Sequence, residues 1–124
     1  LSPKKRLTDE EYLQIAESEV KRLNVYNKAL QYANANEEDE NVFVYELKGF
    51  NLDFKDVKLS VNSKYSNKYQ ISYLIFKEKT FVLSTNVIDL LYNCSSTSCK
   101  EYSYNDVIAI SLINDFKEIY KDEK

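Results

Sequence analysis

The feature of this sequence that most constrains its fold is a change in the spacing of apolar residues near residue 40. Before this point, apolar residues recur every three or four positions, which is the spacing of one face of an α-helix. After it, apolar and polar residues alternate, which is typical of a β-strand with one buried face. A chain that carries both patterns in this order buries them by packing a helix on a sheet, so the sequence predicts an α+β fold.

The helical part opens with a pattern that caps helices. Thr8 is followed three positions later by Glu11, and each side chain can accept a hydrogen bond from the backbone N–H of the other residue. An apolar stripe follows, and the acidic residues 37–40 end it. The sequence therefore predicts one long amphipathic helix from about residue 9 to residue 34. The stripe consists of Leu13, Ala16, Val20, Leu23, Asn27 and Leu30.

Three or four antiparallel strands are expected in the middle of the chain. Their alternating segments are 42–47, 50–61, 69–76 and 80–85, with turns at 62–64 and 77–79. We expect Gly49, the single glycine, at a turn or bulge, and a bend near residues 55–56. Residues 87–92 either extend the last strand or form one helical turn. The short connections favour a meander.

A second capping pattern, Ser103 to Asp106, precedes apolar residues at helical spacing and predicts a closing helix from about residue 104 to residue 121. The β-branched run 107–110 leaves a strand as the alternative. The expected fold is a long N-terminal helix packed on a curled antiparallel sheet of three or four strands, with a C-terminal helix. In element order alone this resembles cystatin-like and NTF2-like architectures, although no motif of either family is present. We expect one domain at 8–124 after a flexible basic tail at 1–7.

Composition removes many chemistries from consideration. The chain has no histidine, so it lacks Ser-His and Cys-His nucleophile pairs, a histidine base and histidine metal ligands. A single glycine leaves no glycine-rich phosphate loop. The net charge of −3 argues against nucleic acid as a partner, and no apolar run approaches the roughly 20 residues of a membrane span. We therefore expect a protein that is not an enzyme and has no cofactor and no metal site.

Both cysteines, Cys94 and Cys99, lie in the short polar stretch YNCSSTSC at 92–99. Four residues separate them, so they do not form a Cys-x-x-Cys redox motif, and two thiols without histidine cannot complete a zinc site. We favour a disulfide that closes a tight turn, with two free thiols as the alternative. Because disulfides persist in oxidising compartments, this predicts an extracytoplasmic protein that is periplasmic, exposed on the cell surface or secreted.

Tyrosine gives the clearest indication of binding. The chain has eleven tyrosines, and Tyr92, Tyr102 and Tyr104 bracket the two cysteines. Tyrosine is enriched at protein interfaces because it offers a large contact area and a polar tip. We expect these three side chains to form part of an interaction surface. By contrast, Tyr69 and Tyr73 share one strand face with two isoleucines and are expected in the core.

The leading functional prediction is an extracytoplasmic, non-enzymatic domain that binds another protein. Such a domain would serve in a surface, secretion or conjugation assembly, or act as a secreted inhibitor. A first alternative is a cytosolic acidic binder, such as an immunity protein or a secretion chaperone, which free thiols would favour. A second alternative is a small-ligand pocket or enzyme of NTF2-like shape, which a cavity between sheet and helix would favour.

Overall fold

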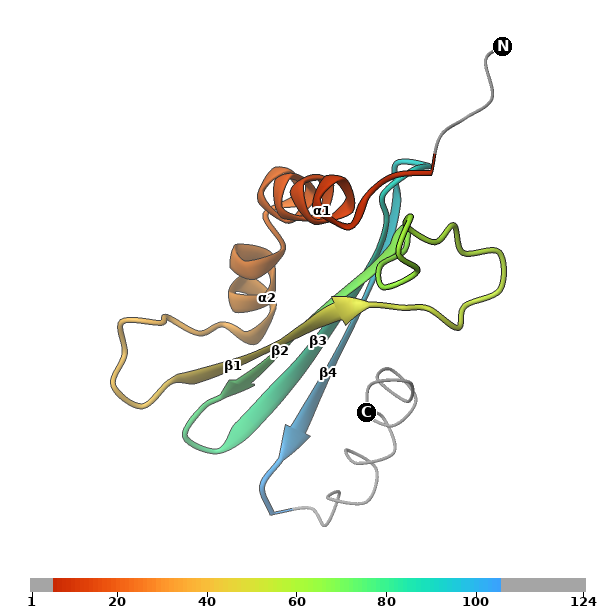
Figure 1. Cartoon of the computed structure of the whole chain (residues 1–124). Coiled ribbons are helices and arrows are strands. Elements are labelled where there is room, and N and C mark those ends of the chain that lie inside the picture. Colours follow the sequence, from red (N-terminus) through yellow and green to blue (C-terminus); the bar gives the residue numbers. More distant parts are fainter. Residues whose placement is uncertain (1–5, 106–124) are drawn as a thin grey trace.

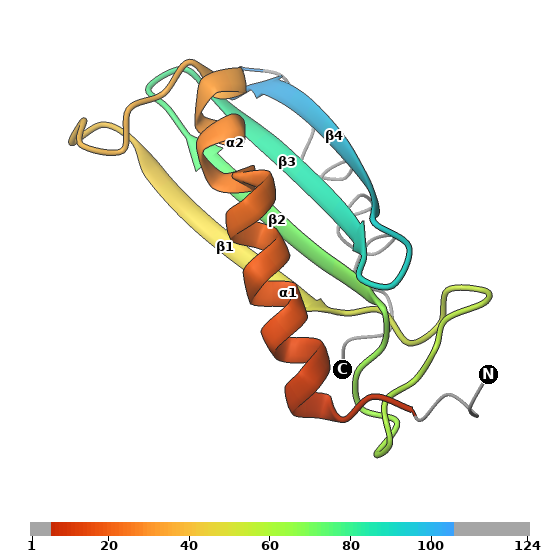
Figure 2. The same cartoon turned by 90° about the horizontal axis from the view of Figure 1, so that it is seen from above.

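The computed structural model in Figure 1 describes residues 6–105 of the chain. It shows two helices followed by an antiparallel sheet with strands in the order β1-β2-β3-β4. Both helices cover the same face of this sheet, as Figure 2 shows from above. The predicted α+β class is therefore confirmed, with four strands. The elements are α1 (Asp9–Leu23), α2 (Val25–Ala33), β1 (Phe43–Phe50), β2 (Lys68–Phe76), β3 (Thr80–Asp89) and β4 (Cys94–Ser103).

The helical region begins as predicted but does not form one long helix. The backbone N–H of Thr8 donates to the Glu11 carboxylate at 2.9 Å, and the Glu11 N–H donates to the Thr8 hydroxyl at 3.1 Å, which completes the capping box. The helix then ends at Asn24, whose backbone is left-handed, with φ 54° and ψ 43°. Asparagine adopts this conformation at lower cost than most residues, so α2 starts in a new direction at Val25. The single helix expected for 9–34 is thus replaced by two.

The core lies between the helices and the central strands. Alternate residues of β2 point toward the helices, and this set includes Tyr69 and Tyr73, which are buried as predicted. They pack against small and branched side chains from both helices and from β3. The buried members of this cluster are Ala16, Val25, Ala29, Leu30, Ala33, Tyr69, Ile71, Tyr73, Ile75 and Val82. The sheet stays open, and the curling that we expected around a long helix is not confirmed.

A long loop at 51–67 replaces the strand expected at 50–61. Its backbone makes one isolated bridge, between Leu59 and Ser66, and turns at Asp56, where φ is 67°. Gly49 is not at a turn, since it lies within β1 opposite Gln70.

The N-terminal segment is attached to the 51–67 loop because Val61 N–H donates to the Leu7 carbonyl at 2.9 Å. The Arg6 guanidinium also donates to the Ser60 carbonyl at 2.7 Å.

The last described strand, β4, occupies the stretch in which we expected a tight turn closed by a disulfide. Residues 87–89 extend β3 as one of our two alternatives proposed, and the chain then turns at 90–93 and returns as β4. The turns expected at 62–64 and 77–79 are confirmed. Residues 104 and 105 form a turn, and the rest of the predicted closing helix at 104–121 lies outside the described residues.

Candidate functional site

A row of aromatic side chains crosses the second face of the sheet, which is the face opposite α1 and α2. Phe43, Phe76, Phe81 and Tyr102 come from β1, β2, β3 and β4, and each lies directly opposite the next in the strand register. Their ring centroids are 6.3, 5.5 and 5.0 Å apart along the row. Tyr104 stacks on Phe81 from beyond β4 at 5.6 Å. We call these five residues the aromatic row.

The aromatic row is anchored at its centre and exposed at its ends. Phe81 is 6% exposed, whereas Phe43 is 63% and Tyr104 45% exposed. Tyr45, two positions along β1 from Phe43 and so on the same face, is 51% exposed. The Tyr104 hydroxyl donates to the Lys77 carbonyl at 2.8 Å, and partial burial raises the pKa of this hydroxyl above its usual value. The row is therefore a fixed aromatic surface rather than a set of loose side chains.

The structure brings together two of the three tyrosines that we expected in one surface. Tyr102 and Tyr104 share the aromatic row, but Tyr92 lies in the turn before the other end of β4. A strand of ten residues spans roughly 30 Å, so Tyr92 cannot contact the same small patch. Sequence reasoning missed the phenylalanines of the row because their partners become neighbours only through the strand register.

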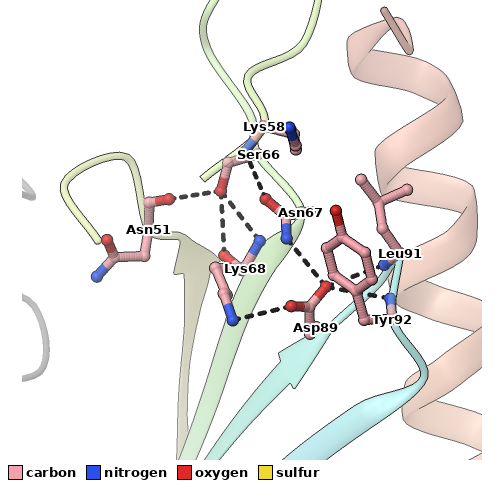
Figure 3. Close-up of polar contacts among 8 residues, drawn as sticks. All are labelled: Asn51, Lys58, Ser66, Asn67, Lys68, Asp89, Leu91 and Tyr92. Carbon is pink, nitrogen blue, oxygen red and sulfur yellow. Dashed lines mark hydrogen bonds and ion pairs between the residues drawn. The ribbon is translucent and has the colours of Figure 1, made fainter. Parts of the chain in front are cut away.

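A cluster of polar groups surrounds the Asp89 carboxylate at the end of β3 (Figure 3). This carboxylate accepts a hydrogen bond from the Asn67 side-chain amide at 2.9 Å and lies 2.9 Å from the Lys68 ammonium. It also accepts from the backbone N–H groups of Leu91 at 3.1 Å and Tyr92 at 3.3 Å. Burial alone would raise the pKa of Asp89, but the hydrogen bonds and the Lys68 charge outweigh it and lower the pKa below its usual value.

The same cluster attaches the 51–67 loop to the sheet. The Asn67 side-chain oxygen accepts from the Lys58 N–H at 2.6 Å, and the Asn67 N–H donates to the Lys58 carbonyl at 3.2 Å. Next to it, the buried Ser66 hydroxyl donates to the Asn51 carbonyl and accepts from the Lys68 N–H at 3.1 Å (Figure 3). No sequence motif marks these residues. Ser66 and Asn67 attach the loop because they are buried, and a buried amide, hydroxyl or carboxylate needs hydrogen-bond partners within the protein.

An open hollow of about 510 Å³ lies beside this cluster. Side chains from the loop, from the ends of β2 and β3 and from the following turn line it, and Tyr92 is among them. The lining residues are Lys55, Asp56, Val57, Lys58, Lys68, Asp89 and Tyr92.

The predicted disulfide between Cys94 and Cys99 is absent from the structure, in which both cysteines are free. They occupy one strand five positions apart, so their side chains point to opposite faces of the sheet. Their Cα atoms are separated by roughly 17 Å of extended chain, whereas a disulfide needs about 4.4–6.8 Å. The tight turn that we expected between them is instead a straight part of β4.

We expect both thiols to react with an alkylating reagent in the folded protein without reductant. Intact mass would then increase by two alkyl groups, and Cys94, which is exposed, should react before the half-buried Cys99. A protein that takes up the reagent only after reduction would contradict the free-thiol arrangement.

In the described part of the chain, no three Cys, Asp or Glu side chains come close enough together to hold a metal ion. None of the helices between residues 6 and 105 has the length and apolar character required to cross a membrane. Comparisons with models of protein families, with curated proteins and with solved structures found no match.

Proposed function

We propose that this protein is a non-enzymatic interaction domain that binds another protein through the aromatic row and Tyr45. The observation that carries the proposal is the exposure of Phe43 and Tyr104 in a row whose central member is buried, with the exposed Tyr45 beside it. Large aromatic side chains lose little rotamer entropy on binding and bury much area, which is why they dominate binding energies at interfaces.

The geometry of the row suits an apolar patch on a partner. The ring contacts hold the side chains in place before binding, so the partner does not have to order them. Tyr45 is 51% exposed, so its hydroxyl can hydrogen-bond at the edge of such a contact, and the Tyr104 hydroxyl, which donates to the Lys77 carbonyl, can still accept a hydrogen bond there. On this proposal the partner presents apolar side chains at the centre of the contact and polar groups around them.

The interior of the described region supports binding over a pocket-based activity. Apolar side chains from α1, α2, β2 and β3 fill the space between the helices and the sheet, where a pocket of NTF2-like shape would lie. Likeness in element order to cystatin-like or NTF2-like architectures stays a proposal, because it depends on the closing helix. An extracytoplasmic location also stays a proposal, and the disulfide that suggested it is absent from the structure.

A second candidate function is that of a cytosolic acidic binder, such as an immunity protein or a secretion chaperone. The free thiols of Cys94 and Cys99 favour it, since reducing compartments keep cysteines in this state. The net charge of −3 and the pI near 5.1 also suit a basic partner surface. The same aromatic row would serve in both candidates, and they differ in compartment and in the charge of the partner.

The test is a double variant, Phe43→Ser with Tyr45→Ser. With a partner captured from the source cells and then purified, we expect the variant to raise Kd by about 100-fold or more, because each exposed anchor contributes about 1–2 kcal/mol. Binding is measured directly by calorimetry, and circular dichroism checks that the fold is retained. The matched control is Tyr32→Ser, since Tyr32 is 54% exposed but lies on α2. Unchanged affinity in the double variant, or an equal loss in the control, would exclude the aromatic row as the contact surface.

A further inference from the structure

We propose that the hollow beside Asp89 binds a phosphate group carried by a planar aromatic ring, with Lys55 and Lys58 holding the phosphate and Tyr92 contacting the ring. The proposal is independent of the interaction surface above, because the aromatic row lies at the other end of the sheet.

The charges that line the hollow favour an anion. Three lysines, Lys55, Lys58 and Lys68, face two acidic residues, Asp56 and Asp89. Lys68 is paired with Asp89 at 2.9 Å, which leaves two lysines and one aspartate. Neither Lys55 nor Lys58 forms an ion pair within residues 6–105, so both ammonium groups are available. Lysine binds phosphate as a flexible point charge, and two lysines on one short segment can share one phosphate group.

Of the two acidic side chains that line the hollow, Asp89 does not oppose this anion. Four donors surround Asp89, namely the Asn67 amide, the Lys68 ammonium and two backbone N–H groups. Its charge is therefore compensated within the protein, and its lowered pKa keeps it ionised and paired at neutral pH. Lys68 in turn is held by this pair, so it acts mainly by neutralising Asp89 and leaves the direct contacts to Lys55 and Lys58.

The backbone of Lys58 is held in place before any ligand arrives. Both backbone groups of Lys58 are hydrogen-bonded to Asn67, which is fully buried. The Lys58 carbonyl also accepts a hydrogen bond from the buried Tyr12 hydroxyl at 3.0 Å. A loop that is already ordered loses little entropy on binding, so even a few charged contacts can give a measurable affinity.

Tyr92 is the residue that contacts the aromatic ring of the ligand. Its side chain is 63% exposed and lines the hollow, so its ring is available for stacking. Its backbone N–H donates to Asp89 at 3.3 Å, which fixes the start of the side chain next to the polar cluster (Figure 3). A planar ligand can therefore lie against Tyr92 while its phosphate reaches the two lysines. The volume of about 510 Å³ is enough for a ring with one phosphate.

The experiment titrates the full chain with phenyl phosphate and with inorganic phosphate, and follows backbone and side-chain amides by NMR. In about 0.1 M sodium chloride, where charges are screened beyond roughly 10 Å, we expect saturable binding of phenyl phosphate with Kd near 1 mM or lower. The largest shifts should occur at the amides of Tyr92, Lys58 and Asn67. Inorganic phosphate should bind more weakly, by about fivefold or more, because it cannot stack on Tyr92.

Two variants test the residues. The double variant Lys55→Gln with Lys58→Gln should weaken phenyl phosphate binding by about tenfold or more, and Tyr92→Ala should remove the difference between the two probes. The matched control is Lys21→Gln with Lys28→Gln, which changes net charge equally but alters exposed lysines on α1 and α2. Shifts that do not saturate, or an equal loss in the control, would mean that anions only associate loosely with the surface and would overturn the proposal.

Discussion

Replacing Tyr73 by alanine is expected to lower the free energy of unfolding by about 4 kcal/mol, the typical cost of removing a large aromatic side chain from a core. Tyr73 is 2% exposed and lies at the centre of β2, facing both helices. Its ring contacts that of Tyr26 on α2, with centroids 5.2 Å apart, so the substitution also removes a contact between the two layers. Urea denaturation at neutral pH measures the change.

Two further variants separate the causes. Tyr73→Phe keeps the ring and should cost less than about 1.5 kcal/mol, so the ring rather than the hydroxyl accounts for most of the effect. Tyr32→Ala removes an exposed tyrosine from α2 and should change stability by less than about 0.5 kcal/mol. If Tyr73→Ala cost no more than Tyr32→Ala, Tyr73 would not belong to the core.

Alkaline pH provides a second measurement on the same residue. Burial, followed by the charge of Glu46, raises the pKa of Tyr73 far above its usual value, which means that the folded protein disfavours tyrosinate. The stability from this group is fully present below the unfolded pKa near 10 and is lost as pH rises above it. Tyr73→Phe should therefore reduce the loss of stability above pH 10.

The core could be predicted because its residues alternate strongly in sequence. Tyr69 and Tyr73 share one face of β2 with isoleucines. The period of two in the sequence predicts both that these residues lie on the same face of the strand and that this face is buried. The capping box at Thr8 was equally readable, since it depends on residues three positions apart. The break at Asn24 was missed because apolar residues recur at helical spacing on both sides of it.

The fourth strand was missed for a physical reason. β4 lies at one edge of the sheet and all ten of its residues are exposed or half-buried, so no alternation of apolar and polar residues was needed. Its Ser, Thr and Cys residues are also typical of a polar turn, which is why the sequence predicted a turn closed by a disulfide between Cys94 and Cys99. The aromatic row depends on the register of four strands, and without β4 its geometry could not be derived.

The Asp89 cluster was unpredictable from sequence for a related reason. Its members lie at 51, 58, 66–68 and 89–92, and none forms a motif with its neighbours in the chain. The cluster holds the loop that bears Lys55 and Lys58 as well as the turn that bears Tyr92. Its stability therefore determines whether the proposed anion site exists, and this makes Asp89 the most informative residue to change.

Replacing Asp89 by alanine is expected to cost about 3 kcal/mol at neutral pH. Asp89 is 8% exposed, and its removal leaves the buried Asn67 amide and the Lys68 ammonium without their acceptor. The loss is expensive mainly because the Asn67 amide is fully buried and has no water to replace this acceptor, whereas the Lys68 side chain is 27% exposed. Urea denaturation measures the loss. The matched control Asp53→Ala removes an exposed acid of the 51–67 loop and should change stability by less than about 0.5 kcal/mol.

The pH dependence tests the charge of Asp89 separately from its shape, with Asp89→Asn as the variant. Because the folded pKa of Asp89 lies below the usual value of 3.8, the folded state binds fewer protons than the unfolded state in this range. The stability from its charge is therefore fully present above the unfolded pKa and is lost as pH falls through the folded pKa. We expect the wild-type protein to exceed Asp89→Asn in stability at about pH 6, and the difference to shrink at about pH 2.5. An equal difference in stability at both pH values would show that the Asp89 side chain acts through its shape and hydrogen bonds alone. The attraction between its negative charge and Lys68 would then contribute nothing to stability.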